Sequence, residues 1–270
     1  VPMSRWTVLH RVMASLSLFL LSSPAPSAQI DYPDRAPEGL VGNGRSIVKV
    51  RADSFEFFDG GTTAGRLRLI VDGQARDLRT DGASATFFPG GVIYRQQLGD
   101  LTVDVLHGAT VDTKYLVGVR VQHARGRVEL EIEGRGEPAL TPAGRVRIPL
   151  HRGSGLVVVA TDPRPAPASW EALRDRVEGP YRQGFLLQTP NAKIDRAVPF
   201  NRFLLDLGFN GRLHVCEIFR WRDVWSRDLG SGLAPGAMVD GAFDAARTTI
   251  EYDLARHARA NPHGYRVTQD

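Results

Sequence analysis

Hydrophobic and polar positions alternate along the first two thirds of the chain. The period of two runs from about Ile47 to Gln188, as in LTVDVLH (101–107), YLVGVRVQH (115–123) and RVELEIE (127–133). Such alternation predicts half-buried antiparallel strands whose polar residues face water. Residues 66–80, RLRLIVDGQARDLRT, predict two strands joined by a tight Asp72-Gly73 turn. VVVA at 157–160 predicts a short strand buried on both faces. Because turn residues recur about every ten positions, the pattern predicts a β-sandwich.

The pattern changes at TDPRPAPASW (161–170), whose three prolines predict a stiff linker or a surface crossover. SWEALRDRVEG (169–179) predicts a short helix with Ser169 as its N-cap. A longer helix is predicted from Thr189, as N-cap, and Pro190, at the first helical position. Gly208 or Gly211 would end this helix, and Pro199 would kink it.

A further helix is predicted within DGAFDAARTTIEYDLARHARANPHG (240–264). Asp240 would cap it, and the spacing of apolar residues predicts a buried stripe of Phe243, Ala246, Ile250 and Leu254. The apolar, glycine-rich DLGSGLAPGAM (228–238) before it predicts an imperfect helix that packs closely through its small residues.

The first thirty residues have the order of a secretory signal peptide. A basic start, MSRWTVLHR, precedes the apolar run VMASLSLFLLSS and the small residues of PAPSAQ. The apolar run is too short to span a bilayer, and no later run is longer, so we expect secretion or export to the periplasm and no stable membrane insertion after cleavage. The expected organisation is a signal peptide at 1–28, a β-sandwich at 29–160, a linker with a short helix and a last strand at 161–188, and a helical region at 189–270.

Composition narrows the function classes. The chain has 270 residues, 42% of them hydrophobic, and its 34 Lys and Arg are interleaved with 30 Asp and Glu. A nucleic-acid partner is not expected, because the positive charge is not gathered in one patch. Cys216 is the single cysteine, so no intramolecular disulfide can form. His214, Cys216 and Glu217 lack further ligands at metal spacing, so neither a metal nor another cofactor is expected. His107, His123 and His151 stand at predicted strand ends with no visible partner.

Residues 219–230, FRWRDVWSRDLG, concentrate three arginines, two aspartates and two tryptophans. On one helix, Asp223 and Arg227 would pair at i, i+4, which would make this a salt-bridged surface turn. A sugar site needs the same mixture, because an aromatic face packs on a pyranose while carboxylate and guanidinium groups bind its hydroxyls.

The WSRDLG motif, the Gly/Ala-rich segment after it and FDAARTTIEYDLARHARANPHG resemble the start of the catalytic domain of six-hairpin glycosidases, the (α/α)6-toroid enzymes that include glucoamylase-like and glycogen-debranching (amylo-α-1,6-glucosidase)-like proteins. These enzymes often carry a β-sandwich before the toroid. The resemblance implies that Trp225, Arg227 and Asp228 bind sugar hydroxyls in the −1 subsite. Trp221, Arg222 and Asp223 are neighbours that would line the same pocket. The glycine-rich LGSGLAPG departs from the regular inner helix of the family.

The expected fold class is therefore multidomain, β then α: an N-terminal antiparallel β-sandwich followed by the first helices of an (α/α)6 toroid. The resemblance implies an exported, inverting glycoside hydrolase of an oligo- or polysaccharide, with possible α-glucosidic links, present as an N-terminal portion. Its catalytic acid and base are expected beyond Asp270, although Asp228, Asp223 and Glu217 can be tried as acids. Phosphorolysis or lyase chemistry on the same toroid stays open. The alternative is that the sandwich itself is a non-catalytic carbohydrate-binding module.

Overall fold

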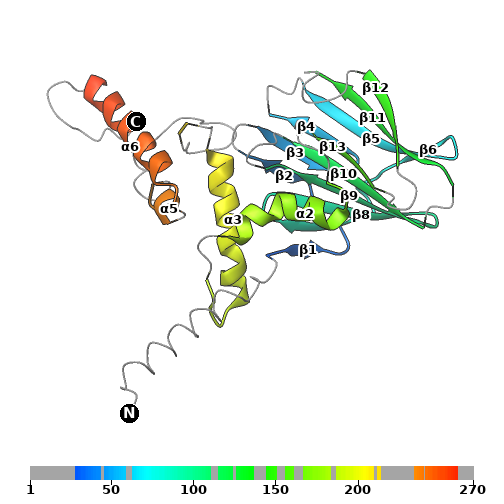
Figure 1. The fold of residues 1–270 in the computed structure, drawn as a ribbon, viewed down its shortest axis with the longest axis horizontal. Helices are drawn as coiled ribbons and strands as arrows, with labels where there is room; N and C mark the ends of the chain where they lie inside the picture. The colour runs from blue at the N-terminus through cyan, green and yellow to red at the C-terminus, as the bar shows by residue number, and fades with distance from the viewer. Residues whose placement is uncertain are drawn as a thin grey trace, which may run out of the picture.

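Two antiparallel sheets, packed face to face, form most of the described chain in this computed structural model (Figure 1). The structure describes residues 28–43, 46–58, 63–110, 115–123, 126–136, 144–150, 156–160, 167–183, 187–209, 212–213, 234–239 and 241–260. The predicted N-terminal β-sandwich is confirmed in these residues. Of the predicted signal peptide, residues 1–27 lie outside them.

Within the described residues, one sheet has six strands and the other has seven. The six-stranded sheet runs in the order β1 (Ile30–Tyr32), β7 (Ser84–Phe88), β8 (Gly91–Leu98), β9 (Leu101–Gly108), β10 (Leu116–Gln122), β13 (Leu156–Ala160). The seven-stranded sheet runs in the order β12 (Gly144–Pro149), β11 (Val128–Arg135), β5 (Ala64–Val71), β4 (Ser54–Phe57), β3 (Ile47–Arg51), β2 (Gly39–Gly42). Its remaining strand, β6 (Gln74–Asp77), pairs with β5 beyond the end of β4.

The alternation of the sequence sets the two faces of each sheet. The inward side chains form one core between the sheets. Those of Val50, Leu67, Val103, Val119 and Leu130 are fully buried. The predicted turn at Asp72-Gly73 is confirmed: both residues have positive φ, 49° and 82°, and they join β5 to β6. That geometry matches the twist of the flanking strands, which is why an Asp-Gly pair suits a two-residue hairpin.

The linker crosses the outer face of the six-stranded sheet as a helix, α2 (Trp170–Glu178), which lies over the strands in Figure 1. As predicted, Ser169 is its N-cap, and the Ser169 hydroxyl accepts a hydrogen bond from the Ala172 amide at 3.1 Å. Glycines let the helix approach closely. A Cβ on Gly118 would stand 2.2 Å from Leu173, and one on Gly108 would stand 2.8 Å from Val177. Covered in this way, β9 is buried on both faces.

A short 3-10 helix, η1 (Gly179–Arg182), continues from α2 and leads to α3 (Ala192–Gly208). Described residues in the predicted linker range 161–188 form α2 and η1 and no strand. The predicted stop at Gly208 is confirmed, and Pro199 lies inside the helix. The predicted N-cap was wrong. Asn191 caps α3 through the Lys193 amide at 3.0 Å, whereas Thr189 binds the Asp195 carboxylate through its own amide and hydroxyl.

The imperfect helix predicted from the glycine-rich segment is α5 (Ala234–Val239), and the helix after it is α6 (Phe243–Ala260). A Cβ on Gly236 would lie 3.3 Å from Leu205, which confirms close packing of α5 on α3. The stripe predicted for α6 was wrong in part. Ala246 is buried, but Phe243 and Leu254 are 61% and 45% exposed, while Thr249 and Asp253 are buried instead. Figure 1 shows α5 and α6 beyond α3, away from the sheets.

Candidate functional site

The six residues proposed to bind sugar, Trp221, Arg222, Asp223, Trp225, Arg227 and Asp228, lie outside the described residues, as do His214, Cys216 and Glu217. Their roles stay predictions. The structure does describe the helices that flank this motif. It lies between α3, which ends at Gly208, and α5, which begins at Ala234.

The start of the helical region packs against the sandwich through a small buried cluster, which we call the seat of α3. Tyr181 of η1 meets Phe203 of α3 edge to face, with ring centroids 5.7 Å apart. Leu207, 1% exposed, packs with them against Ile47 at the end of β3. The Arg202 guanidinium also donates to the Gln183 carbonyl. These contacts hold α3, and therefore the point where the motif's segment begins, against the β-sandwich.

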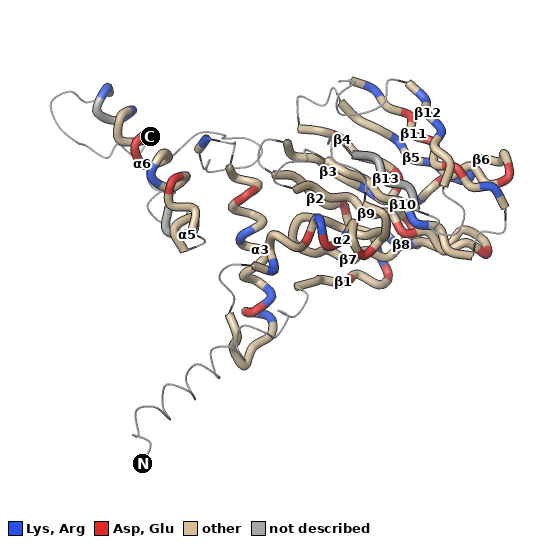
Figure 2. The backbone as a smooth tube through the Cα atoms, viewed as in Figure 1, with Lys and Arg blue, Asp and Glu red and all other residues tan. Residues whose placement is uncertain are grey.

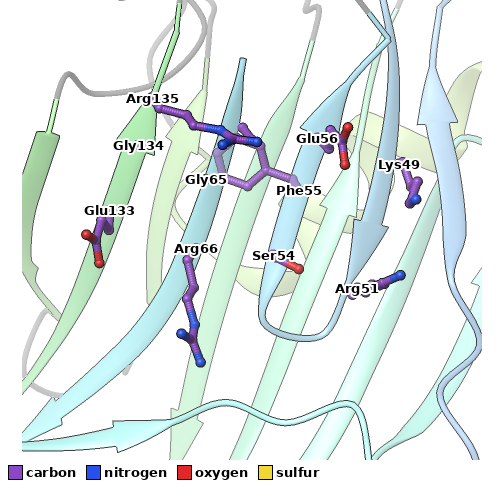
Figure 3. A pocket seen from close by; sticks show the side chains of 11 residues that line it. Lys49, Arg51, Ser54, Phe55, Glu56, Gly65, Arg66, Glu133, Gly134 and Arg135 are labelled. Atoms are coloured by element: carbon purple, nitrogen blue, oxygen red, sulfur yellow. The ribbon is translucent and has the colours of Figure 1, made fainter. Parts of the chain in front are cut away.

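An open depression lies on the outer face of the seven-stranded sheet, away from α2. It has a volume of about 510 Å³, and charged side chains of β3, β4, β5 and β11 lie around it (Figure 3). Its lining residues are Lys49, Arg51, Ser54, Phe55, Glu56, Ala64, Gly65, Arg66, Glu133, Gly134 and Arg135. This hollow brings six charged side chains together, and we take it as the candidate binding site.

Strand register explains the shape of this depression. Across β3, β4, β5 and β11, one row of paired residues reads Lys49, Glu56, Ala64 and Arg135. The adjacent row on the same face reads Arg51, Ser54, Arg66 and Glu133. Ala64 and Ser54 are the short side chains in these rows, and long charged side chains surround them. The hollow is therefore about one side chain deep, with Ala64 and Ser54 at its floor.

Charges around the depression alternate with those of neighbouring strands, as Figure 2 shows for β5, β11 and β12. The Glu38 carboxylate lies 2.8 Å from Arg51 and 3.4 Å from Lys49. Two of the four basic groups that line the hollow are therefore already paired at its edge.

The other side is less tightly paired. Arg66 makes a contact of 3.9 Å with Asp77, and Glu133 lies 3.5 Å from Arg145. Within the described part of the chain, neither Glu56 nor Arg135 takes part in an ion pair or a side-chain hydrogen bond. A carboxylate and a guanidinium thus face each other across Ala64 with their bonding capacity unused. Such groups can accept from a ligand hydroxyl and donate to a ligand oxygen.

A buried aromatic cluster supports the floor from beneath. Phe55 points into the core across the β4–β5 pair, and its ring covers Gly65, where a Cβ would stand 2.3 Å from the ring. Phe55 also contacts Tyr115 of the facing sheet, with ring centroids 4.8 Å apart. Packing of this kind fixes the relative positions of the strands whose outward residues form the rim.

A second hollow, of about 460 Å³, lies between β1 and α3 and is lined in part by Asp31, Lys193, Arg196 and Phe200. Asp31 is already bound there, since its carboxylate accepts from the Thr86 hydroxyl at 2.7 Å. This hollow therefore lies between α3 and the edge strand β1 of the sandwich.

The most strongly perturbed titratable groups lie inside the core and not in either hollow. Nδ1 of His107 lies 2.7 Å from the Tyr115 hydroxyl, and His107 is 0% exposed. Burial lowers the pKa of His107 to about 3, so the ring is neutral at physiological pH. Burial also raises the pKa of Tyr94 and of Tyr115. The sequence alone shows no partner for His107. In the structure its partner is Tyr115, which directly precedes β10, the strand that pairs with β9.

No group of three or more His, Cys, Asp and Glu side chains in the described ranges is arranged to hold a metal ion. Among the helices that are described, none combines the length and the apolar character that crossing a bilayer requires.

Comparison of the chain with protein-family models, with curated proteins and with solved structures finds no match in any of the three.

Sequence reasoning missed the depression on the seven-stranded sheet. The signal was present as outward charges on alternate positions of KVRADSFEF (49–57) and VELEIEGR (128–135). Each stretch alone predicts only a solvated strand face. The short residue Ala64 becomes informative once the register sets it between Glu56 and Arg135.

Proposed function

We propose that this chain is the N-terminal part of an exported, inverting glycoside hydrolase that acts on an oligo- or polysaccharide, with an (α/α)6 toroid that continues beyond Asp270. The proposal rests on the resemblance of WSRDLG and its surroundings to six-hairpin glycosidases and on the order of a sandwich, a linker and helices. One structural observation carries it furthest: the contrast between the closed core of the sandwich and the exposed apolar side chains of the helices.

Six of the ten exposed large apolar side chains among the described residues lie on α3, α5 and α6. Leu204 on α3 is 52% exposed, Val239 on α5 is 63% exposed and Phe243 on α6 is 61% exposed. Met238 and Leu254 are also about half exposed, at 49% and 45%. Helices that present apolar residues in this way need further helices to cover them, because exposed apolar area costs free energy. A helical domain with more helices than α3, α5 and α6 would cover these apolar side chains.

The chemistry follows from the motif between these helices. The Trp225 ring would pack on the apolar face of a sugar ring, while the Arg227 guanidinium donates to hydroxyl oxygens and the Asp228 carboxylate accepts from hydroxyl hydrogens. These residues would hold the sugar and leave its bond cleavage to other groups. An inverting enzyme also needs a carboxylic acid and a carboxylate base, roughly 6.5–9.5 Å apart, and we expect this pair in the later helices.

The test begins with the reading frame downstream of Asp270 and uses the extended chain that it encodes. We expect further helical sequence, release of reducing sugar from a polysaccharide panel, and products of inverted anomeric configuration by NMR. Arg227→Ala should lower activity by about a hundredfold or more, because it removes charge-assisted bonds to the bound sugar. Arg76→Ala, on the exposed β6, is the matched control and should leave activity unchanged.

A stop codon directly after Asp270 would count against the proposal. Equal activity of the Arg227→Ala variant and the parent protein would remove the role assigned to the motif. Retained anomeric configuration would exclude the inverting mechanism.

A further inference from the structure

We propose that the depression on the seven-stranded sheet binds a carboxylate-bearing sugar unit of an acidic polysaccharide. All of the residues that line the depression belong to the sandwich. The inference does not depend on the hydrolase proposal. It rests on the shape of the hollow, the chemistry of its rim and the bonding capacity left unused there.

The shape suits one sugar ring. Glu56 and Arg135 both pair with Ala64, one from each side, so their strands are separated by two strand spacings, or about 10 Å. Because Ala64 has a short side chain, no long side chain of β5 stands between Glu56 and Arg135 in this row. Arg66 stands two residues from Ala64 on the same face of β5, and Ser54 pairs with Arg66. A ring lying over Ala64 would therefore meet Arg135, Arg66 and Glu56 at once.

The rim favours an anionic ligand that also has hydroxyls. Of the six long charged side chains, four are basic (Lys49, Arg51, Arg66 and Arg135) and two are acidic (Glu56 and Glu133). Lys49 and Arg51 are paired with Glu38, so Arg66 and Arg135 are the basic groups on which binding of an anion depends. A guanidinium binds a carboxylate through two parallel hydrogen bonds, and Arg135 has no competing ion pair among the described residues. The Glu56 carboxylate has no proton to donate, so it can only accept hydrogen bonds, for example from a sugar hydroxyl. A uronate ring supplies both groups.

The same rim disfavours nucleic acid. A phosphodiester group offers no hydrogen-bond donor to the carboxylates of Glu56 and Glu133, whereas a sugar hydroxyl does. Single-stranded nucleic acid also needs exposed aromatic rings on which its bases stack. The one aromatic residue in the lining, Phe55, is 4% exposed and faces the core. A polyanion that lacks hydroxyl donors would therefore gain less here than a polyuronate.

Affinity electrophoresis of the chain in gels that contain polygalacturonate tests the proposal directly. We expect retardation that weakens with added salt, and no retardation in dextran, a neutral polysaccharide. Arg135→Gln and Glu56→Gln should each weaken binding by about tenfold or more, as expected when a charge-assisted hydrogen bond is lost. Ala64→Leu should abolish binding by filling the floor while leaving every charge in place.

Arg76→Gln is the matched control, because it removes the same charge from exposed β6 outside the depression. Its retardation should equal that of the parent protein. Circular dichroism melts that match the parent would show that each variant is folded.

Equal retardation in polygalacturonate and in dextran would overturn the assignment to an acidic sugar. Equal retardation by polyphosphate, or an Arg76→Gln effect as large as that of Arg135→Gln, would show general charge attraction and overturn the site. Absence of retardation in polygalacturonate would overturn it as well. None of these outcomes tests the hydrolase proposal, which the Arg227→Ala variant of the extended chain tests separately.

Discussion

His107 makes the stability of the sandwich depend on pH. The ring is fully buried between the sheets, its pKa is lowered to about 3 by burial, and its Nδ1 shares a hydrogen bond with the Tyr115 hydroxyl. In the unfolded chain its pKa returns to about 6.5. Below that value the unfolded state binds a proton that the native state does not, so acidification favours unfolding. The contribution to stability is complete above about pH 6.5 and is lost progressively toward about pH 3.

The size of the effect follows from the interval between the two pKa values. Between about pH 7.5 and about pH 5 the native ring stays neutral while the unfolded ring becomes protonated. Each pH unit below 6.5 then removes about 1.4 kcal/mol, so the free energy of unfolding should fall by about 2 kcal/mol at pH 5 through this residue. Tyr94 and Tyr115 face the ring but do not titrate in this range, since burial raises the pKa of both.

Urea unfolding at the two pH values measures this directly when the parent protein is compared with His107→Asn. Asparagine places an amide near the position of Nδ1 and does not titrate, so it should destabilise the protein to a similar degree at both pH values. Carboxylates and exposed histidines contribute equally to both proteins and cancel in the comparison. The reasoning fails if the two proteins lose the same free energy of unfolding on acidification.

Two further predictions concern the seating of the helices. Gly118→Ala should lower the free energy of unfolding by about 1–3 kcal/mol, because its Cβ would stand 2.2 Å from Leu173 of α2; Gly179→Ala, whose Cβ would meet nothing within 4 Å, should have no such cost, and denaturant melts of the two variants check this. Leu207→Ala should destabilise the seat of α3 by about 2–5 kcal/mol and speed limited proteolysis between the sandwich and α3. Leu204→Ala on the same helix, where the parent residue is 52% exposed, should leave the proteolysis rate unchanged, and equal rates for the two variants would refute this account of the seat.

Local signals in the sequence predicted local structure well. The Asp72-Gly73 turn and the Ser169 cap depend on residues within a few positions of one another, so both were predicted correctly. The start of α3 was predicted wrongly because Thr189 and Asn191 both have side chains that can cap a helix. The sequence cannot show that the Asp195 carboxylate engages Thr189 and leaves Asn191 to cap the helix.

Features that depend on distant pairing could not be predicted. The stripe assigned to α6 assumed that the apolar residues form its packed face, but Ala246 and Thr249 are buried and Phe243 is exposed. The partner of His107 and the meeting of Glu56 with Arg135 across Ala64 both follow from strand register, which one sequence does not specify. The sugar-binding motif around Trp225 stays a prediction from the sequence.

The glycine surface beneath α2 has a consequence for how close this helix lies to the sandwich. Trp170, Leu173 and Val177 of α2 pack against the sheet around Gly108 and Gly118. Moving α2 off the sheet would expose these three buried side chains, each of which stabilises the contact by about 1.5–3 kcal/mol. Single hydrogen atoms, in place of side chains at Gly108 and Gly118, thus set the distance between the sheet and α2, and a larger residue at either position would push the whole helix outward.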